Sequence, residues 1–152
     1  MAVTVKGDFS KLENLLKGLK TKMSVRVGVF KEATTPDGEK VASYGADNEF
    51  GVPERRIPER SFIRMPIETK AEKIAADVGK RKRDRIEQGN IRGIFEDIGL
   101  AAEAVIQEAF DTRGFGTWKE NAEMTIDKKG SDAPLIDQGL LRRSITSKVV
   151  EK

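Results

Sequence analysis

Residues 91–110 read IRGIFEDIGLAAEAVIQEAF, and this stretch decides the fold. Its apolar residues recur every three or four positions, which is the spacing of one face of an α-helix. They are Ile94, Phe95, Ile98, Ala101, Ala102, Val105, Ile106 and Ala109. The opposite face is acidic, with Glu96, Glu103 and Glu108. The stretch therefore predicts an amphipathic helix that buries one face and presents carboxylates on the other.

Two alternating segments outside this helix predict strands. In residues 24–30, Val25, Val27 and Val29 share one face, and residues 144–150 alternate in the same way. We expect both strands to pair in one sheet, with the central helix covering a face of it. The order of elements predicts an α+β fold, in which helices cover a small antiparallel or mixed sheet and residues 1–152 form one domain.

Further helices are expected on either side of the first strand and before the central helix. Helical periodicity marks residues 10–20 and 40–50, and a third helix follows Pro66, which suits the first position of a helix. Two segments rich in turn-forming residues, 31–40 and 111–132, predict loops. We expect these loops to be the most mobile parts of an isolated subunit and to become ordered on assembly.

Composition excludes several classes of function. The chain has 152 residues and contains neither His nor Cys, which excludes disulfides, thiolate nucleophiles, imidazole bases and ordinary zinc sites. The remaining carboxylates show no acid–base spacing, and Ser144 has no His to activate it. We expect no enzymatic activity, no cofactor and no metal. No apolar run approaches a membrane span, so no membrane partner is expected.

Charge is nearly balanced overall but sorted along the chain. There are 28 Lys and Arg against 25 Asp and Glu. Residues 80–92 hold six bases against two acids, whereas residues 94–111 hold five acids and no base. Two such neighbouring segments predict a matched electrostatic pair, either within one subunit or between subunits.

Three features suggest contacts with a partner, and each has a plainer explanation. The Pro-rich connector 52–66 carries four arginines beside Phe62, which suits either a subunit interface or a solvated loop. The basic run 80–85, with Lys82 and Arg83, suits either phosphate contacts or a solvated helix end. Trp118 either fills its own domain or anchors a partner. The connector arginines are Arg55, Arg56, Arg60 and Arg64.

Two stretches together resemble the motifs of a phage protein family. Residues 42–51 (ASYGADNEFG) and 57–64 (IPERSFIR) are similar to an "A…NEFG…IPxRxFxR" segment. Trp118, followed by PLIDQGLLRRSI at residues 134–145, is similar to a "W…T…K…PLxDTGxLxxSI" ending. These motifs are typical of the HK97 gp10-like and Mu gpG-like neck and tail-component proteins of tailed phages. Ser61 and Gln138 depart from the usual Pro and Thr or Ser.

The motif residues have a structural rather than a catalytic character. We expect Glu49, Phe50 and Gly51 to end a helix with an apolar plug and a left-handed stop. In the second motif, Asp137 is expected to cap a short helical turn and Gly139 to permit close backbone approach. Leu141, with Leu135, Ile136 and Leu140, should anchor that turn to the core.

The resemblance implies a structural virion protein that forms a ring at the head–tail junction or at the tail end. The roles included are neck, head–tail joining, tail terminator and tail completion. The implied partners are further copies of the chain, as a hexamer or, on the portal side, a dodecamer, and portal, adaptor or tail-tube proteins. DNA would pass through the lumen without specific binding. The implied location is the virion, after assembly in the host cytoplasm.

Two other classes of function remain as alternatives. One is a nucleic-acid-binding module that uses the basic run 80–85, and the other is a metabolic enzyme, which the lack of His and Cys disfavours. For the ring, we expect the acidic face with Glu96, Glu103 and Glu108 to meet bases of the neighbouring subunit. The candidate bases lie in the connector and in the basic run. A rival arrangement places the acidic face in the lumen.

Overall fold

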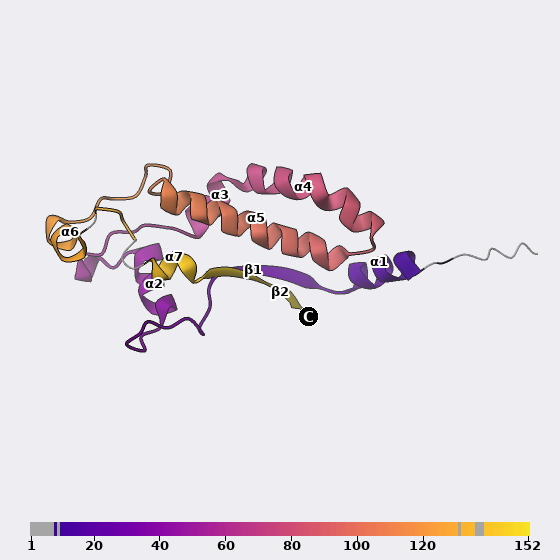
Figure 1. Ribbon diagram of the computed structural model, residues 1–152, viewed down its shortest axis with the longest axis horizontal. Coiled ribbons are helices and arrows are strands. Elements are labelled where there is room, and N and C mark those ends of the chain that lie inside the picture. The colour runs from indigo at the N-terminus through magenta and orange to yellow at the C-terminus, as the bar shows by residue number, and fades with distance from the viewer. Residues whose placement is uncertain (1–7, 9, 131, 136–138) are drawn as a thin grey trace, which may run out of the picture.

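The computed structural model describes residues 8, 10–130, 132–135 and 139–152, and it has the α+β architecture that the sequence predicts. The molecule is elongated (Figure 1). A long helix, α5 (Ile91–Asp111), lies along a two-stranded sheet, with α4 (Ala71–Glu87) on its other side. Helix α1 (Ser10–Lys20) lies at one end of the long axis and α2 (Val41–Phe50) lies toward the other.

The sheet pairs the two predicted strands. Strand β1 (Met23–Val29) runs antiparallel to β2 (Ile145–Glu151), with Val25 opposite Val149 and Val29 opposite Ile145. Helix α5 covers one face of this pair. Gly99 lets the helix come close, since a Cβ on this residue would lie 2.4 Å from Ser147 Oγ. The predicted pairing of the strands and their cover by the central helix are confirmed.

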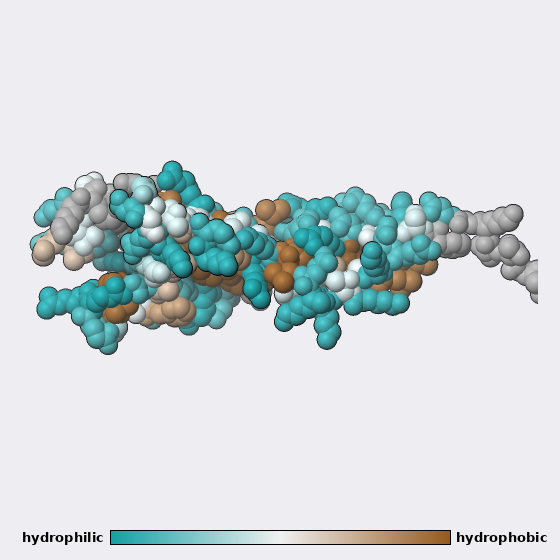
Figure 2. Space-filling model, turned by 90° about the horizontal axis from the view of Figure 1, so that it is seen from below, coloured by the Kyte–Doolittle hydropathy of each residue, from teal (hydrophilic) through white to brown (hydrophobic). Residues whose placement is uncertain are grey.

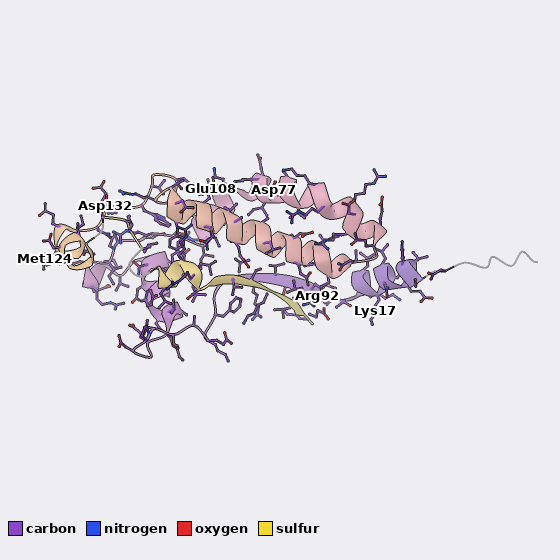
Figure 3. All side chains as sticks on the ribbon, in the orientation of Figure 1. Lys17, Asp77, Arg92, Glu108, Met124 and Asp132 are labelled. Atoms are coloured by element: carbon purple, nitrogen blue, oxygen red, sulfur yellow. The ribbon has the colours of Figure 1, made fainter. Side chains whose placement is uncertain are left out.

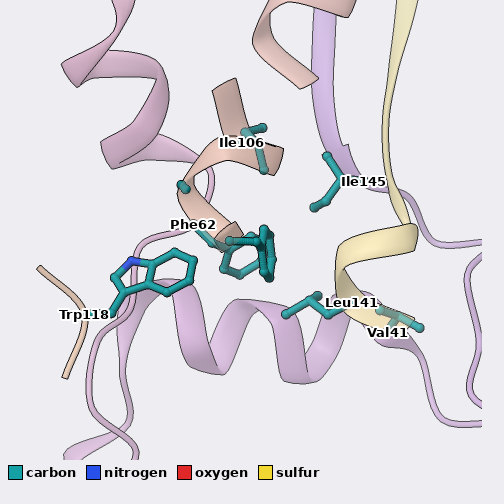
Figure 4. Packing of buried hydrophobic residues seen from close by; sticks show 8 residues of the cluster. Val41, Phe62, Ile106, Trp118, Leu141 and Ile145 are labelled. Carbon is teal, nitrogen blue, oxygen red and sulfur yellow. The ribbon is translucent and has the colours of Figure 1, made fainter. Parts of the chain in front are cut away.

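Helix α5 begins at a side-chain cap and ends in the core. Asn90 is its N-cap, and the side chain accepts a hydrogen bond from the backbone N–H of Gly93 at 2.8 Å. Near the other end, Ile106 and Phe110 join a buried cluster with residues from five other segments (Figure 4). The cluster consists of Val41, Phe62, Ile106, Ala109, Phe110, Trp118, Leu141 and Ile145. The main core therefore lies at the α2 end of the molecule.

The region between α2 and α4 contains short elements. A 3-10 turn, η1 (Pro53–Arg55), follows α2, and helix α3 (Arg64–Thr69) precedes α4. Pro66 is the third residue of α3 and not its first, contrary to the expectation. It remains in the first turn, where the N–H group that proline lacks would have no partner within the helix.

The two segments expected to be loops differ from each other. Within residues 31–40, Thr34 pairs with Lys40 as an isolated bridge around a turn. Residues 111–132 contain helix α6 (Glu123–Lys129), so the expectation of a loop throughout is wrong there. Gly130 is the C-cap of α6 and adopts a left-handed backbone conformation, which ends this short helix. Helix α7 (Leu140–Arg143) precedes β2, while Asp137 lies outside the described residues.

Candidate functional site

The first motif is organised around a buried carboxylate. Glu49 lies at the end of α2 and is 6% exposed. Its two oxygens accept hydrogen bonds from Ser61 Oγ at 2.7 Å and from the backbone N–H groups of Phe62, Ile63 and Arg64 at 2.7, 2.9 and 3.0 Å. These N–H groups lie at the start of α3, where no helical partner exists for them and where the helix dipole favours a negative charge. Glu49 therefore caps α3 from another helix.

Ser61 extends this cap. Its Oγ also accepts a hydrogen bond from the Met65 N–H at 3.0 Å, and its carbonyl accepts one from Trp118 Nε1 at 3.1 Å. Ser61 is thus bonded to α2, to α3 and to the segment after α5. A Pro at this position would lack the hydroxyl that makes the first two of these bonds.

Arg60 points into the molecule and not toward a neighbour. Its Nε donates to the carbonyl of Lys119 at 2.7 Å, and Nη2 donates to the carbonyl of Glu120 at 2.8 Å. The residue is buried, and this burial lowers the pKa of its guanidinium from the ordinary value. Arg60 links the connector to residues about 60 positions later, so its expected role in a subunit interface is wrong.

Phe62 and Trp118, also predicted as interface residues, are internal. The Phe62 ring lies 5.7 Å from the ring of Phe110, and Phe110 lies 5.5 Å from Trp118 in an edge-to-face arrangement (Figure 4). Edge-to-face aromatic pairs add stability beyond the area that they bury. Of the two possibilities for Trp118, the structure shows the indole filling its own domain.

Phe50 and Gly51 end α2 differently from the expectation. Phe50 is 68% exposed, so it does not plug the helix end. It follows Glu49 by one residue and therefore points about 100° away from the buried face of the helix. Gly51 does have a positive φ of 73°, and a Cβ there would lie 2.8 Å from the backbone nitrogen of Glu59. Close approach of the connector thus requires Gly at this position.

An apolar groove of about 290 Å³ opens beside α2. Its walls include Val29, Ala46, Phe50 and Ile63. The Glu49 carboxylate borders it, but both oxygens are already occupied by four donors. The groove therefore offers apolar contact and no reactive group.

The second motif meets the first through α7. Leu141 is buried, and a Cβ on Gly45 of α2 would lie 3.2 Å from its Cδ1 atom. This confirms that Leu141 anchors the turn. Gly139 has a positive φ of 68°, and none of the described residues lies within 4 Å of where its Cβ would be. Gly is therefore needed for the backbone conformation at the start of α7, and the expected close approach involves none of the described residues.

The exposed connector arginines are partly paired within the chain. Arg55 forms an ion pair with Asp47 at 2.5 Å, and Arg64 forms one with Glu59 at 2.7 Å. Arg56 is exposed and adopts a left-handed conformation with φ of 55°. Of the four predicted interface arginines, Arg56 alone is exposed without an ion pair to another described residue.

Most bases of the run 80–85 pair with carboxylates of the same subunit, and none of these carboxylates is Glu96, Glu103 or Glu108. Arg85 binds Asp97 through two hydrogen bonds, at 2.9 and 3.1 Å, and Arg81 reaches the same carboxylate at 3.4 Å. The hydrogen bond from Arg85 is the main reason that the pKa of Asp97 lies below its ordinary value, against the opposing effect of burial. Lys80 pairs with Asp77, and Arg83 pairs with Glu87. Among the described residues, no ion pair involves Lys82.

Two of the three predicted acidic interface residues are paired in the same way. Glu108, labelled in Figure 3, binds Lys73 at 2.5 Å. This hydrogen bond lowers the pKa of Glu108 and raises that of Lys73. Glu96 binds Arg92, which also binds Glu151 and so ties α5 to β2. Glu103 has no ion pair within the described part of the chain. The acidic face is thus largely neutralised within the subunit.

Sequence reasoning missed Asp97 and Ser61. Asp97 is three residues after Ile94 and four before Ala101, so it falls on the apolar stripe of its helix. An acid on an apolar stripe predicts a buried, paired carboxylate. No comparable signal marks Ser61, because its partners are distant in sequence.

Comparisons with known proteins identify no relative. No model of a known protein family matches the chain, and no curated protein or solved structure is significantly similar to it. None of the helices in the described ranges is long and apolar enough to cross a membrane. Within the same ranges, no cluster of three or more carboxylates is arranged to hold a metal ion.

Proposed function

We propose that this chain is a structural subunit of a ring at the head–tail junction or tail end of a tailed phage. One observation carries the proposal beyond the sequence resemblance. The two motif segments, which are distant in the chain, lie against each other through Gly45 and Leu141 and share one core. Their polar residues hold backbone in place rather than presenting a reactive group. Such an arrangement suits a protein that works by its shape.

The exposed apolar side chains support a role in assembly. Leu12, Leu16 and Leu19 form a stripe on α1, and all three are about half exposed or more. Leu100 on α5 and Phe50 on α2 are also exposed, and α2 lies toward the opposite end of the molecule from α1 (Figure 1). A head-to-tail ring buries two different surfaces at each contact, so apolar residues at separate places on the molecule fit this symmetry.

The nucleic-acid-binding alternative based on the basic run 80–85 has less support. Lys80, Arg81, Arg83 and Arg85 each pair with a carboxylate of the same chain. Binding of phosphates through these side chains would have to replace existing ion pairs. Lys82 alone would offer an unpaired charge within this run.

The number of subunits is the quantity that tests the proposal. We expect a hexamer, or a dodecamer if the ring contacts the portal, and the virion partners would be portal, adaptor or tail-tube proteins. Native mass spectrometry over a concentration series should show one closed oligomer, and negative-stain microscopy should show rings with a lumen. A monomer or dimer at every concentration would contradict self-assembly into a ring.

A further inference from the structure

On one face of the sheet, the charged strand residues are all cations. Successive residues of a strand point to opposite faces. Val25 and Ser147 lie against Gly99 of α5. These two residues, and every second residue from them along each strand, therefore face the helix. The charged strand residues that point to the other face are Arg26 and Lys148, and Lys22 and Lys152 lie directly beyond the end of the ladder on that face; all four are exposed. We call this surface the outer sheet face.

No described helix covers the outer sheet face. In Figure 1, α5 and α4 lie on one side of the strands, and α2 lies beyond one end of them rather than over their middle. At that end Gly28 is buried close to Ile63, so the open part of the face lies farther along the strands. The view from below in Figure 2 shows hydrophilic side chains, with hydrophobic ones between them, over the middle of the molecule. The four cations are therefore open to an external partner.

Two of these cations are directly opposed. The strand register places Arg26 opposite Lys148, and like charges in such a cross-strand pair repel each other. Lys148 is held by the Phe30 ring, 4.1 Å from its Nζ atom, and by Glu32 at 3.7 Å. Arg26 has no ion pair to any residue that the structure describes. One carboxylate thus faces two adjacent bases.

The other two cations repeat this arrangement farther along the strands. The backbone N–H of Lys152 donates to the carbonyl of Lys22 at 2.8 Å, which continues the ladder beyond the strand ends. Arg26 follows Lys22 by four positions, a distance of about 13 Å along a strand. Duplex DNA carries one negative charge for about every 1.7 Å of its axis. So dense a row of charges offers a phosphate within reach of each of the spaced cations.

We infer that the outer sheet face contacts the phosphate backbone of duplex DNA without reading its sequence. A protein partner would need an apolar centre in the contact, and this face offers only the half-buried Phe30 and Val150. The choice of duplex DNA among polyanions rests on the proposed function, because a ring between head and tail encloses the passing genome. The basic run on α4 is a weaker candidate, because four of its bases, all but Lys82, already pair with carboxylates.

The test removes two charges from the face and compares this change with an equal loss elsewhere. R26T/K148T places β-favouring residues at exposed strand positions. The matched control K80A/R83A removes two bases that are paired within α4. Binding of a labelled duplex of random sequence is measured by fluorescence anisotropy as salt is raised. R26T/K148T removes a repulsive pair but also the contacts of Lys148 with Phe30 and Glu32, so thermal unfolding is measured to check that the variant stays folded.

Four phosphate contacts predict that the affinity of the wild-type chain falls about 150-fold between about 50 and 200 mM salt. With two contacts left, R26T/K148T should lose only about 12-fold over the same range and bind more weakly at low salt. K80A/R83A should match the wild type. Absence of salt-dependent binding by the wild type, or equal slopes for the wild type and R26T/K148T, would overturn the inference.

Native mass spectra of the same proteins separate this inference from the proposed function. If the wild type binds DNA as described but never forms rings, the proposed function fails and the contact surface stands. If rings form and DNA binding is absent, the contact surface is wrong and the ring stands. If R26T/K148T loses the ring, the outer sheet face is a subunit interface, and the inference is overturned.

Discussion

The Glu49 carboxylate accepts a hydrogen bond of 2.7 Å from the backbone N–H of Phe62, although the two residues are 13 positions apart. The carboxylate ends one helix and caps the start of another, and the same cap fixes Ser61 below the Trp118 indole. A single buried charge thus holds together α2, α3 and the aromatic part of the core.

Replacing Glu49 should therefore be among the most destabilising single changes. In E49A, the N–H groups of Phe62, Ile63 and Arg64 lose their acceptor in a buried site. We expect the free energy of unfolding to fall by about 2–4 kcal/mol. The exposed Glu59 provides the control, since E59Q should change it by less than about 0.5 kcal/mol. Urea unfolding followed by circular dichroism measures both, and equal midpoints would refute the cap.

How far the sequence predicts this arrangement depends on the range of the interaction. Strand alternation and helical periodicity are local patterns, so the sheet pairing and α5 could be predicted from them. The direction of Arg60 could not, because its acceptors are the carbonyls of Lys119 and Glu120. A long cationic side chain in a Pro-rich connector looks exposed until the segment beside it is known.

The inward direction of Glu49 could nevertheless have been predicted from the local spacing of residues in α2. Val41, Gly45 and Glu49 are spaced by four residues, and all three are buried on one face of α2. That spacing already indicates that Glu49 points inward and Phe50 outward. The mobility of residues 31–40 and 111–132 stays a prediction, which amide hydrogen exchange of the isolated subunit would measure.

Two glycines within helices should respond in opposite ways to the same substitution. Gly99 in α5 faces β2, and a Cβ there would lie 2.8 Å from the Cβ of Ser147. G99A should push the helix off the sheet and destabilise the protein by about 1–3 kcal/mol. Gly79 in α4 has no neighbour within 4 Å among the residues that the structure describes, so G79A should stabilise the protein by about 0.5–1 kcal/mol. Thermal unfolding of both variants gives the signs, and a stabilised G99A would contradict the close packing.

The only Trp in the chain gives a direct optical readout of the core. W118F keeps an aromatic ring but leaves the Ser61 carbonyl without its donor, which should cost about 1–2 kcal/mol. W118A should cost about 3–5 kcal/mol through the lost packing. In the wild type, tryptophan emission should shift to the red at the same urea concentration at which the helices unfold. Red-shifted emission from the native protein would mean that the indole is exposed and would contradict its place in the core.

The Asp97 ion pair should make stability depend on acid. The hydrogen bond from Arg85 holds the pKa of Asp97 below its ordinary value in the folded state. A group with a lowered folded pKa stabilises the protein above its unfolded pKa, which is about 3.9, and this contribution is lost as pH falls through the folded value. D97N should therefore be less stable than the wild type at pH 7, and the difference should shrink below about pH 4.

Urea midpoints of the wild type and D97N across this pH range measure the effect. The partly exposed pair of Glu108 and Lys73 provides a comparison, because E108Q should change stability little at any pH. A constant difference between the wild type and D97N from pH 7 to pH 3 would show that the charge of Asp97 is not what stabilises the fold.

The last prediction concerns which charges join neighbouring subunits in the proposed ring. The acidic face of α5 was expected to meet the connector arginines and the basic run, but Arg60 is buried and its reversal would disrupt the fold. Arg56 takes the place of Arg60 in the test, because it is exposed without an ion pair to any described residue.

Exposed pairs contribute less than about 1 kcal/mol each, so a single charge reversal should do little to ring assembly. The variant R56E/R64E/K82E/R83E should abolish ring formation at low salt, while circular dichroism shows a folded monomer. Adding E96K/E103K/E108K should restore part of the assembly, because the opposed charges are then exchanged. If the fourfold variant forms rings normally in native mass spectra, the acidic face borders the lumen or solvent, and α5 does not meet these bases across the subunit contact.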